Sequence, residues 1–226
     1  MVATPTPSTT DGASPKRMRR KDARPGELLQ AALTLFVAKG YAATRLEDVA
    51  RYAGVSKGTL FLYFESKEEL FKAVVRQNLA GYFPVWNAEF EAFEGSTVDM
   101  VKHAMLQWWE RVGSTQAGGL NKLMISEASN FPELATFYEQ EVMLPARELL
   151  RRILQRGVTR GEFRDIDLQY GAYTLLAPML LLATWTHALG PTCPSLQHLN
   201  PQQYLLTQAD HILQGLCVRP HKKASR

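Results

Sequence analysis

The sequence has only two cysteines among its 226 residues, Cys193 and Cys217, and it contains no CxxC pair. Two cysteines are too few for a disulfide framework or for a four-ligand zinc knuckle. We therefore expect a protein of the reducing cytoplasm.

Several short motifs that mark enzyme and nucleotide sites are also missing. No GxGxxG, P-loop or HExxH pattern occurs, so the usual dinucleotide, phosphate and zinc-protease sites are not expected. The five histidines are scattered without the spacing of metal ligands: His103, His187, His198, His211 and His221. These absences predict no metal and no cofactor, and they leave a helical enzyme only as a minor alternative.

What the chain does contain is apolar residues and an uneven distribution of charge. Hydrophobic residues make up 46% of it, enough for one large domain or two modest ones with an apolar core. Residues 1–70 hold 11 Lys and Arg against 8 Asp and Glu, residues 71–218 hold 11 against 14, and the last eight residues hold four basic residues and no acid. Positive charge at both ends suits a polyanionic partner.

The first 14 residues are rich in Thr, Pro and Ser and lack the apolar run that a secretory signal needs. We interpret residues 1–23 as a disordered basic arm and residues 219–226 as a basic tail. The arm carries the cluster Lys16-Arg17-Met18-Arg19-Arg20-Lys21, which can lie along phosphates or can simply be a solvated tail.

No charged residue occurs between Leu168 and Ala209. A bilayer span takes about 20 apolar residues. The longest candidate, residues 171–190, contains three threonines, Pro178 and His187, and no basic loop flanks it. We therefore expect no membrane partner. A helix that is apolar around most of its circumference is more simply buried on two sides, against its own domain and against a second copy of the chain.

The hydrophobic periodicity near the N-terminus predicts a series of helices. Residues 27–40 carry an apolar stripe at helical spacing, and Gly40 follows as a stop signal. Residues 44–47 have the form of a capping box, so a second helix is expected to start at about Arg45 and to end at Gly54. Gly54-Val55-Ser56 then forms a tight corner.

Beyond this corner Ser56 is the expected N-cap of a short helix over residues 57–64. Ser66-Lys67-Glu68-Glu69 is a second capping box and opens a longer helix. Two short helices joined by a three-residue turn with Gly, packed against a first helix, predict a helix-turn-helix. On spacing alone, a generic helical hairpin remains an alternative.

These residues resemble the DNA-binding domain of the TetR (tetracycline-repressor-type) transcriptional regulators. The resemblance runs over about 40 residues and rests on Phe36, Gly40-Tyr41, Thr44, Val49-Ala50, Ala53-Gly54-Val55-Ser56-Lys57-Gly58-Thr59-Leu60, Tyr63-Phe64, Ser66-Lys67 and Glu69-Leu70. It implies an all-α homodimer with an N-terminal three-helix helix-turn-helix domain, here residues 24–70, and a larger helical ligand-binding and dimerisation domain, here residues 71–218.

The resemblance also implies a function. Such a protein is a ligand-responsive transcriptional regulator, usually a repressor that a small apolar or amphipathic effector releases from a palindromic operator in double-stranded DNA. A helical interaction module that no longer binds DNA remains an alternative. That alternative draws on the slight acidity of residues 27–70 and on Phe61, which stands where the family usually has tyrosine.

Carried over by position, the resemblance assigns DNA contacts to eight residues. Thr44, with Arg45 beside it, would bind a phosphate at the start of the second helix. Lys57, Gly58 and Thr59 would face the major groove, where the missing side chain of Gly58 permits close approach. Phe61 would pack against a thymine methyl or a sugar, and Tyr63 and Lys67 would bind phosphates.

Aromatic and Met residues are dense in the second half of the chain, where core packing is the simplest explanation for any one of them. As a set they favour a cavity, because such side chains line adaptable apolar pockets. The candidates for effector binding are Trp86, Phe90, Met105, Trp108, Met124, Glu127, Phe131 and Tyr173. His103 is a further possible polar anchor. Residues 167–189 and 201–216 are expected to pair with their copies in a four-helix dimer interface.

Overall fold

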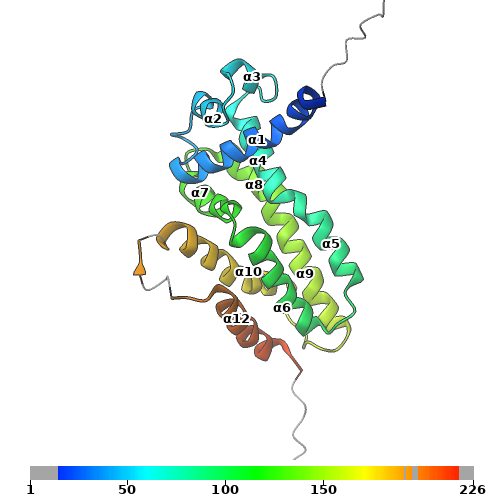
Figure 1. The fold of residues 1–226 in the computed structure, drawn as a ribbon. Helices are drawn as coiled ribbons and strands as arrows, with labels where there is room; N and C mark the ends of the chain where they lie inside the picture. The colour runs from blue at the N-terminus through cyan, green and yellow to red at the C-terminus, as the bar shows by residue number, and fades with distance from the viewer. Residues whose placement is uncertain (1–14, 191, 195–197, 219–226) are drawn as a thin grey trace, which may run out of the picture.

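The computed structural model describes residues 15–190, 192–194 and 198–218 (Figure 1). Every element in these ranges is a helix, apart from an isolated antiparallel bridge between Phe163 and Cys217. The all-α prediction is therefore confirmed. The expected tail at 219–226 and the first 14 residues of the expected arm lie outside the described residues.

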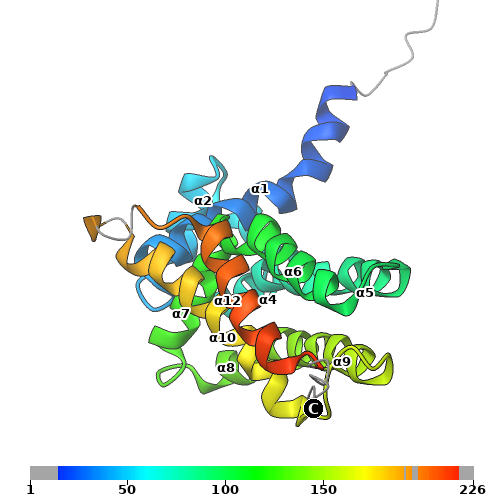
Figure 2. The ribbon, with the colours of Figure 1, turned by 90° about the horizontal axis from the view of Figure 1, so that it is seen from below.

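The first helix is longer than the sequence indicated. Helix α1 spans Pro15–Lys39 and ends at Gly40, whose φ of 89° lies in the left-handed region that glycine adopts most readily. The prediction of a disordered arm is therefore wrong for residues 15–23, which continue α1 as a helix. Figure 2 shows this N-terminal part of α1 extending away from the other helices.

The predicted helix-turn-helix is formed by α2 (Leu46–Tyr52) and α3 (Lys57–Phe61), and the longer helix α4 (Lys67–Asn78) follows it. Ser56 caps α3 by accepting from the N–H of Thr59, and Ser66 caps α4 by accepting from the N–H of Glu69. Gly54 makes the corner with a φ of 67°. These caps and the corner confirm the sequence interpretation.

The capping box expected at Thr44 is not formed. The residue before α2 is Arg45, and its side chain makes no capping hydrogen bond. Thr44 is only 1% exposed, and its hydroxyl lies within hydrogen-bonding distance of the carbonyl oxygens of Gly40, at 2.7 Å, and Leu35, at 3.3 Å. Its side chain thus ties the loop back to the end of α1 instead of capping α2.

The remaining helices lie below these four in Figure 1. The label η marks short 3₁₀-helical turns (η1, η3) and π-helical turns (η2, η4, η5) among them. Their bounds are η1 (Ala80–Tyr82), α5 (Phe83–Ala92), α6 (Thr97–Trp108), η2 (Trp109–Gly113), η3 (Gln116–Gly118), α7 (Gly119–Glu127), α8 (Pro132–Tyr138), η4 (Glu139–Met143), α9 (Leu144–Thr159), α10 (Leu168–Thr184), η5 (Trp185–Leu189) and α12 (Pro201–Leu216).

Two apolar clusters hold these helices together. One joins α1–α4 to α7, α8 and η4 and includes Phe36, Phe71, Leu120 and Leu134. The other joins α6, α9, α10 and α12. Because Phe71, Val74 and Val75 of α4 belong to the first cluster, the expected domain boundary at residue 70 falls inside α4, and the core of the N-terminal helices continues into the larger domain.

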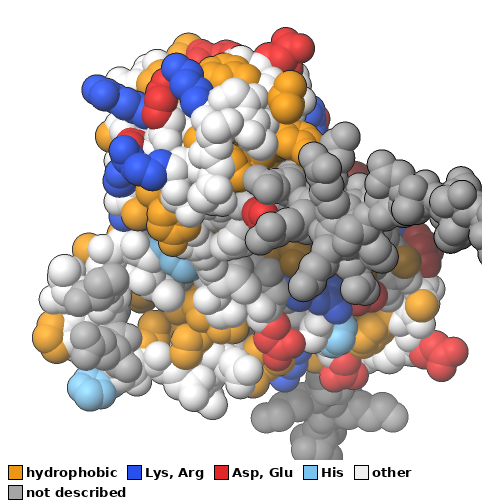
Figure 3. Space-filling model, turned by 45° about the horizontal axis from the view of Figure 1, so that its top comes forward, with side chains coloured by type: hydrophobic (Ala, Val, Ile, Leu, Met, Phe, Trp, Pro, Cys, Tyr) orange, Lys and Arg blue, Asp and Glu red, His pale blue; other side chains and the backbone are white. Residues whose placement is uncertain are grey.

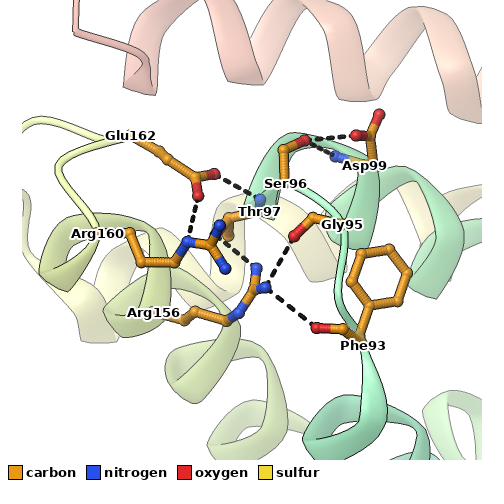
Figure 4. A network of polar contacts seen from close by, with 8 residues as sticks. All are labelled: Phe93, Gly95, Ser96, Thr97, Asp99, Arg156, Arg160 and Glu162. Atoms are coloured by element: carbon orange, nitrogen blue, oxygen red, sulfur yellow. Dashed lines mark hydrogen bonds and ion pairs between the residues drawn. The ribbon is translucent and has the colours of Figure 1, made fainter.

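A polar network anchors the end of α9 to the turn between α5 and α6 (Figure 4). The Arg156 guanidinium donates to the hydroxyl of Thr97 at 2.8 Å and to the carbonyl oxygens of Gly95 at 2.8 Å and Phe93 at 3.2 Å. Glu162 accepts from the N–H of Thr97, the first residue of α6, and pairs with Arg160 at 2.6 Å. The network fixes how α5 and α6 lie over α9.

Helix α10 and the π-helical turn η5 cover residues 168–189, the first part of the charge-free segment. By length and composition alone, the described residues include one helix able to cross a membrane, Leu168–Leu189, and 39% of its most apolar window is buried. The buried side chains of α10 pack on α9 and α12. Its exposed side includes Tyr170, Tyr173 and Leu181, which are 70%, 39% and 42% exposed.

Candidate DNA-binding surface and effector cavity

The helix-turn-helix places α3 on the outer side of the N-terminal helices, at the end of the molecule away from α12 (Figure 1). Leu60 on the inner side of α3 is fully buried, whereas Lys57 and Gly58 are exposed and Thr59 is half-buried. A Cβ added at Gly58 would come no closer than 3.8 Å to another atom, the Ser56 hydroxyl oxygen. Nothing inside the protein therefore requires glycine here, although glycine weakens a helix.

Two cations at the starts of α2 and α3 are exposed. The Lys57 ammonium pairs with the Glu47 carboxylate at 2.5 Å and lies 5.6 Å from the centre of the Phe61 ring. A hydrogen bond from Lys57 lowers the pKa of the Glu47 carboxyl. Arg45 is exposed at the start of α2. Figure 3 shows Lys and Arg side chains beside exposed hydrophobic ones on this part of the surface. A phosphate approaching Lys57 would compete with Glu47.

Two of the eight expected DNA contacts have other partners. Thr44 is buried, so its hydroxyl cannot reach a phosphate in this conformation. The Lys67 ammonium is half-buried, donates to the carbonyl oxygens of Tyr41 at 2.9 Å and Ala42 at 3.3 Å, and lies 4.3 Å from the centre of the Tyr41 ring. Desolvation lowers the pKa of Lys67, and the charge of Glu127 opposes that shift. Both side chains hold the loop before α2.

Residues 54–58, Gly-Val-Ser-Lys-Gly, also fit the GxSxG pattern of hydrolase nucleophiles. That motif requires a sharp turn from a strand into a helix. Here the turn joins two helices, and the Ser56 hydroxyl oxygen caps α3. The pattern therefore reflects the corner of the helix-turn-helix.

The loop between α1 and α2 is also held from the larger domain. The carboxylate of Glu127, the last residue of α7, accepts from the N–H of Ala42 at 3.1 Å. A Cβ on Gly40 would lie 2.9 Å from the same carboxylate oxygen. The Tyr41 ring packs edge-on against Phe131, with 4.7 Å between the ring centres. Residues 40–44 therefore lie between α4 and α7.

The larger domain contains an apolar cavity of about 110 Å³. Its walls come from α5, α6, α9 and α10, and the end of α4, η3 and α7 also contribute. Of the eight expected effector residues, Trp86, Phe90 and Trp108 line it. His103, the possible polar anchor, lines it as well.

The other five expected effector residues do not line this cavity. Met105 is buried in the core between α6, α9 and α10, and Met124 is buried in the core shared with the N-terminal helices. Glu127 and Phe131 contact the loop before α2. Tyr173 is exposed on α10 and pairs with Arg147. Helical periodicity showed that these side chains cluster, but not which side of each helix faces the open space.

Two single π-helical turns contribute directly to the cavity wall. Val112 belongs to η2, and Val142 and Met143 belong to η4. A third, η5, contacts η2 because the His187 Nε2 lies 2.9 Å from the carbonyl oxygen of Gly113. Such turns interrupt regular helices and are frequent at functional sites.

Comparison with known proteins agrees with this geometry. Residues 28–74 match the family described as bacterial regulatory proteins of the tetR family, and residues 94–192 match the tetracyclin repressor-like C-terminal domain. The repressor KstR2 of Mycolicibacterium smegmatis is 30% identical over 151 residues, which cover 65% of this chain and 72% of that protein. An uncharacterised regulator of Bacillus subtilis, YfiR, is 28% identical over 68% of this chain and 75% of its own length.

A third relative matches over a shorter stretch of the chain. The Escherichia coli regulator RutR is 46% identical over 78 residues, which cover 34% of this chain and 35% of that protein. Among solved structures, a TetR-family regulator of Mesorhizobium loti has a TM-score of 0.69 at 20% identity, over 88% of this chain and 99% of that one. KstR2 of Mycobacterium tuberculosis has a TM-score of 0.67 at 23% identity, over 87% and 96%.

The fold and the two matched regions define a helix-turn-helix transcriptional regulator with a larger helical second domain. The chain belongs to the TetR family.

Proposed function

We propose that two copies of this chain bind a palindromic operator in double-stranded DNA and repress transcription until a small apolar or amphipathic effector enters the cavity. The observation that carries the proposal is the position of the cavity relative to the helix-turn-helix. Leu79, which directly follows α4, lines the cavity, and Lys67, which begins α4, holds the loop before α2. Helix α7 makes a second connection, from Asn121 in the cavity wall to Glu127 at that loop.

The exposed part of α3 supports the assignment of DNA contacts. We assign Lys57, Gly58 and Thr59 to the major groove, with Arg45 and Tyr63 at phosphates and Phe61 against a sugar or a thymine methyl. Thr44 and Lys67 position the loop instead of binding phosphates through their side chains. An operator contact that uses Lys57 would replace its pair with Glu47.

The proposed dimer uses α10 and α12. Tyr170, Tyr173, Ala177 and Leu181 are exposed at spacings of three and four residues and therefore share one side of α10. A second copy packed on this side would bury it, and the charge-free segment from Leu168 to Ala209 favours such an apolar contact. Two α3 helices would then contact half-sites about 34–36 Å apart, or a multiple of that distance.

Repression and release follow from linkage. An effector that binds more tightly to a conformation with displaced α4 or α7 weakens DNA binding by the same factor by which DNA weakens effector binding. KstR2, which is similar to this chain over 72% of its own length, is a transcriptional repressor, and this similarity supports repression as the mode of action. We place the regulator in the cytoplasm, where its DNA lies.

The test is to sequence the DNA fragments that the purified protein captures from the genome of its source organism. We expect one enriched palindrome with half-sites one or more helical turns apart. The matched control is Gly58→Asp, which puts a negative charge at the groove without an internal clash. This variant should keep the helical circular dichroism spectrum and enrich no sequence. Equal enrichment by both proteins, or no common palindrome, would contradict the proposal.

A further inference from the structure

The polar side chains in the cavity wall differ in whether they already have partners. Both carboxylate oxygens of Glu89 accept from Arg111, at 2.6 and 3.0 Å. The side-chain amide of Asn121 donates to the Thr184 hydroxyl at 3.0 Å, and that of Gln107 donates to Glu110 at 3.1 Å. Each of these groups thus already has at least one partner within the protein.

Tyr138 is the exception among the buried residues of the wall. It is 8% exposed, it lines the cavity, and within the described part of the chain its hydroxyl makes no hydrogen bond. In that part of the chain, every fully buried side-chain oxygen or nitrogen has a hydrogen-bond partner. Because the Tyr138 hydroxyl has none, it is not fully buried and keeps some accessible surface. A hydroxyl in a largely apolar wall gains from a hydrogen bond, and a guest with an acceptor atom would supply one.

The hydroxyl would act as a donor and not as an anion. Burial raises the pKa of Tyr138 well above its ordinary value. The phenol therefore stays protonated at neutral pH and can donate its O–H.

The rest of the wall disfavours a charged guest. Among the described residues that line the cavity there is no lysine or arginine, and the neighbouring Arg111 is paired with Glu89. A carboxylate buried in this space would have no free cation beside it, and an unpaired buried charge is far more costly than a neutral polar group. His103 is exposed and is not part of the buried wall.

We propose, on the basis of the proposed function, that the Tyr138 hydroxyl recognises the effector, and that the effector is an uncharged apolar molecule with a hydrogen-bond acceptor, such as a carbonyl oxygen, at the end that reaches Tyr138. The apolar walls bind its hydrocarbon part without strong shape selection. Tyr138 selects the molecule by one polar atom and fixes its orientation.

The test compares three bicyclic probes of similar size: tetralin, which has no polar atom, 2-tetralone, which adds one carbonyl, and tetralin-2-carboxylate, which adds a charge. Binding to the full-length protein is measured by isothermal titration calorimetry. A single hydrogen bond contributes about 1 kcal/mol net, so 2-tetralone should bind about fivefold more tightly than tetralin. The carboxylate should bind about tenfold more weakly than 2-tetralone, or more weakly still.

The decisive variant is Tyr138→Phe, which keeps the ring and removes the hydroxyl. It should bind tetralin as the wild type does and lose the preference for 2-tetralone. The control is Tyr52→Phe, whose side chain is 62% exposed on α2 and should leave all three affinities unchanged. Circular dichroism and the tetralin affinity report whether Tyr138→Phe is folded with its cavity intact.

A preference for the ketone that persists in Tyr138→Phe, tight binding of the carboxylate, or no binding of any probe would overturn the inference. Release of the captured operator is measured separately with the same probes. Binding that depends on Tyr138 but releases no DNA would contradict the proposed function and leave this inference standing. Release of DNA by the probes that does not depend on Tyr138 would contradict this inference and leave the proposed function standing.

Discussion

The carboxylate of Glu127 accepts a hydrogen bond from the backbone N–H of Ala42, with 3.1 Å between oxygen and nitrogen. This contact joins α7, whose first half lines the cavity, to the loop that leads into α2. The Lys67 ammonium binds two carbonyl oxygens of the same loop from the other side. The loop before the helix-turn-helix is thus fixed by two helices that both reach the cavity.

Replacing Glu127 should loosen this loop. We expect Glu127→Ala to weaken operator binding several-fold, because one hydrogen bond of about 1 kcal/mol that holds the start of α2 is lost. Glu127→Gln keeps an acceptor oxygen and should remain close to wild type. Fluorescence anisotropy with the captured operator measures both. Equal losses in the two variants would show that the charge matters and the hydrogen bond does not.

Gly58 and Gly54 should respond differently to alanine. At Gly58 the added Cβ meets no close atom, so Gly58→Ala should leave the free energy of unfolding unchanged or raise it by up to about 1 kcal/mol. Its operator affinity should fall, because the backbone can no longer approach the bases. Gly54→Ala forces a φ of 67° on alanine and should cost roughly 1–2 kcal/mol of stability.

Urea unfolding and anisotropy separate these two effects. Full operator affinity in Gly58→Ala would remove this glycine from the proposed DNA-binding surface, whereas unchanged stability in Gly54→Ala would contradict the role of the corner.

The helix ends of the N-terminal part show what the sequence can predict. The caps at Ser56 and Ser66 and the stop at Gly40 depend on neighbours within four residues, so local patterns located them correctly. Thr44 shows the same local pattern, yet its hydroxyl bonds back to α1, because packing of the loop offered it buried carbonyl partners.

The cavity was harder to predict, because its walls come from residues far apart in the sequence. Met124 and Trp108 look alike in a list of large apolar residues, but only Trp108 faces the open space. The sequence does not distinguish Tyr138 from a core residue, because a buried tyrosine in an apolar helix has the same pattern. Its missing hydrogen-bond partner becomes visible only in three dimensions.

The two lysines near the loop should affect the salt dependence of DNA binding differently. Lys57 is exposed and is assigned to the groove, so Lys57→Ala should reduce the slope of log affinity against log salt by about one. Lys67 donates to carbonyl oxygens inside the protein. Lys67→Ala should therefore weaken binding with a smaller change of slope and should also lower the free energy of unfolding. Identical slopes for the two variants would reject this division of roles.

Stability should fall at alkaline pH because of buried phenols. Desolvation, aided by the charges of Glu68, Glu133 and Glu127, raises the pKa of Tyr41 to about 12. The folded state thus prefers the neutral phenol: the resulting stability is complete below about pH 10, the pKa of an unfolded tyrosine, and is lost as pH rises toward 12. Each such group contributes a slope of up to about 1.4 kcal/mol per pH unit.

Tyr41→Phe keeps the ring contacts and should reduce this alkaline loss, which urea unfolding between pH 8 and 11.5 would measure. Tyr52→Phe, at an exposed site, is the matched control and should leave the slope unchanged. A steeper loss in Tyr41→Phe than in the wild type would contradict the sign of this argument.

Arg156 should matter far more for stability than its neighbour Arg151, although both lie on α9. Arg156 donates to three acceptors that fix the α5–α6 turn (Figure 4), and its loss leaves the buried Thr97 hydroxyl without that donor. We expect Arg156→Ala to lower the free energy of unfolding by about 2 kcal/mol. Among the described residues Arg151 pairs only with Glu148, at the surface, so Arg151→Ala should change the free energy of unfolding by less than about 0.5 kcal/mol. Because Phe93 both accepts from Arg156 and lines the cavity, Arg156→Ala should also weaken tetralin binding, and unaltered binding would show that the cavity does not depend on this anchor.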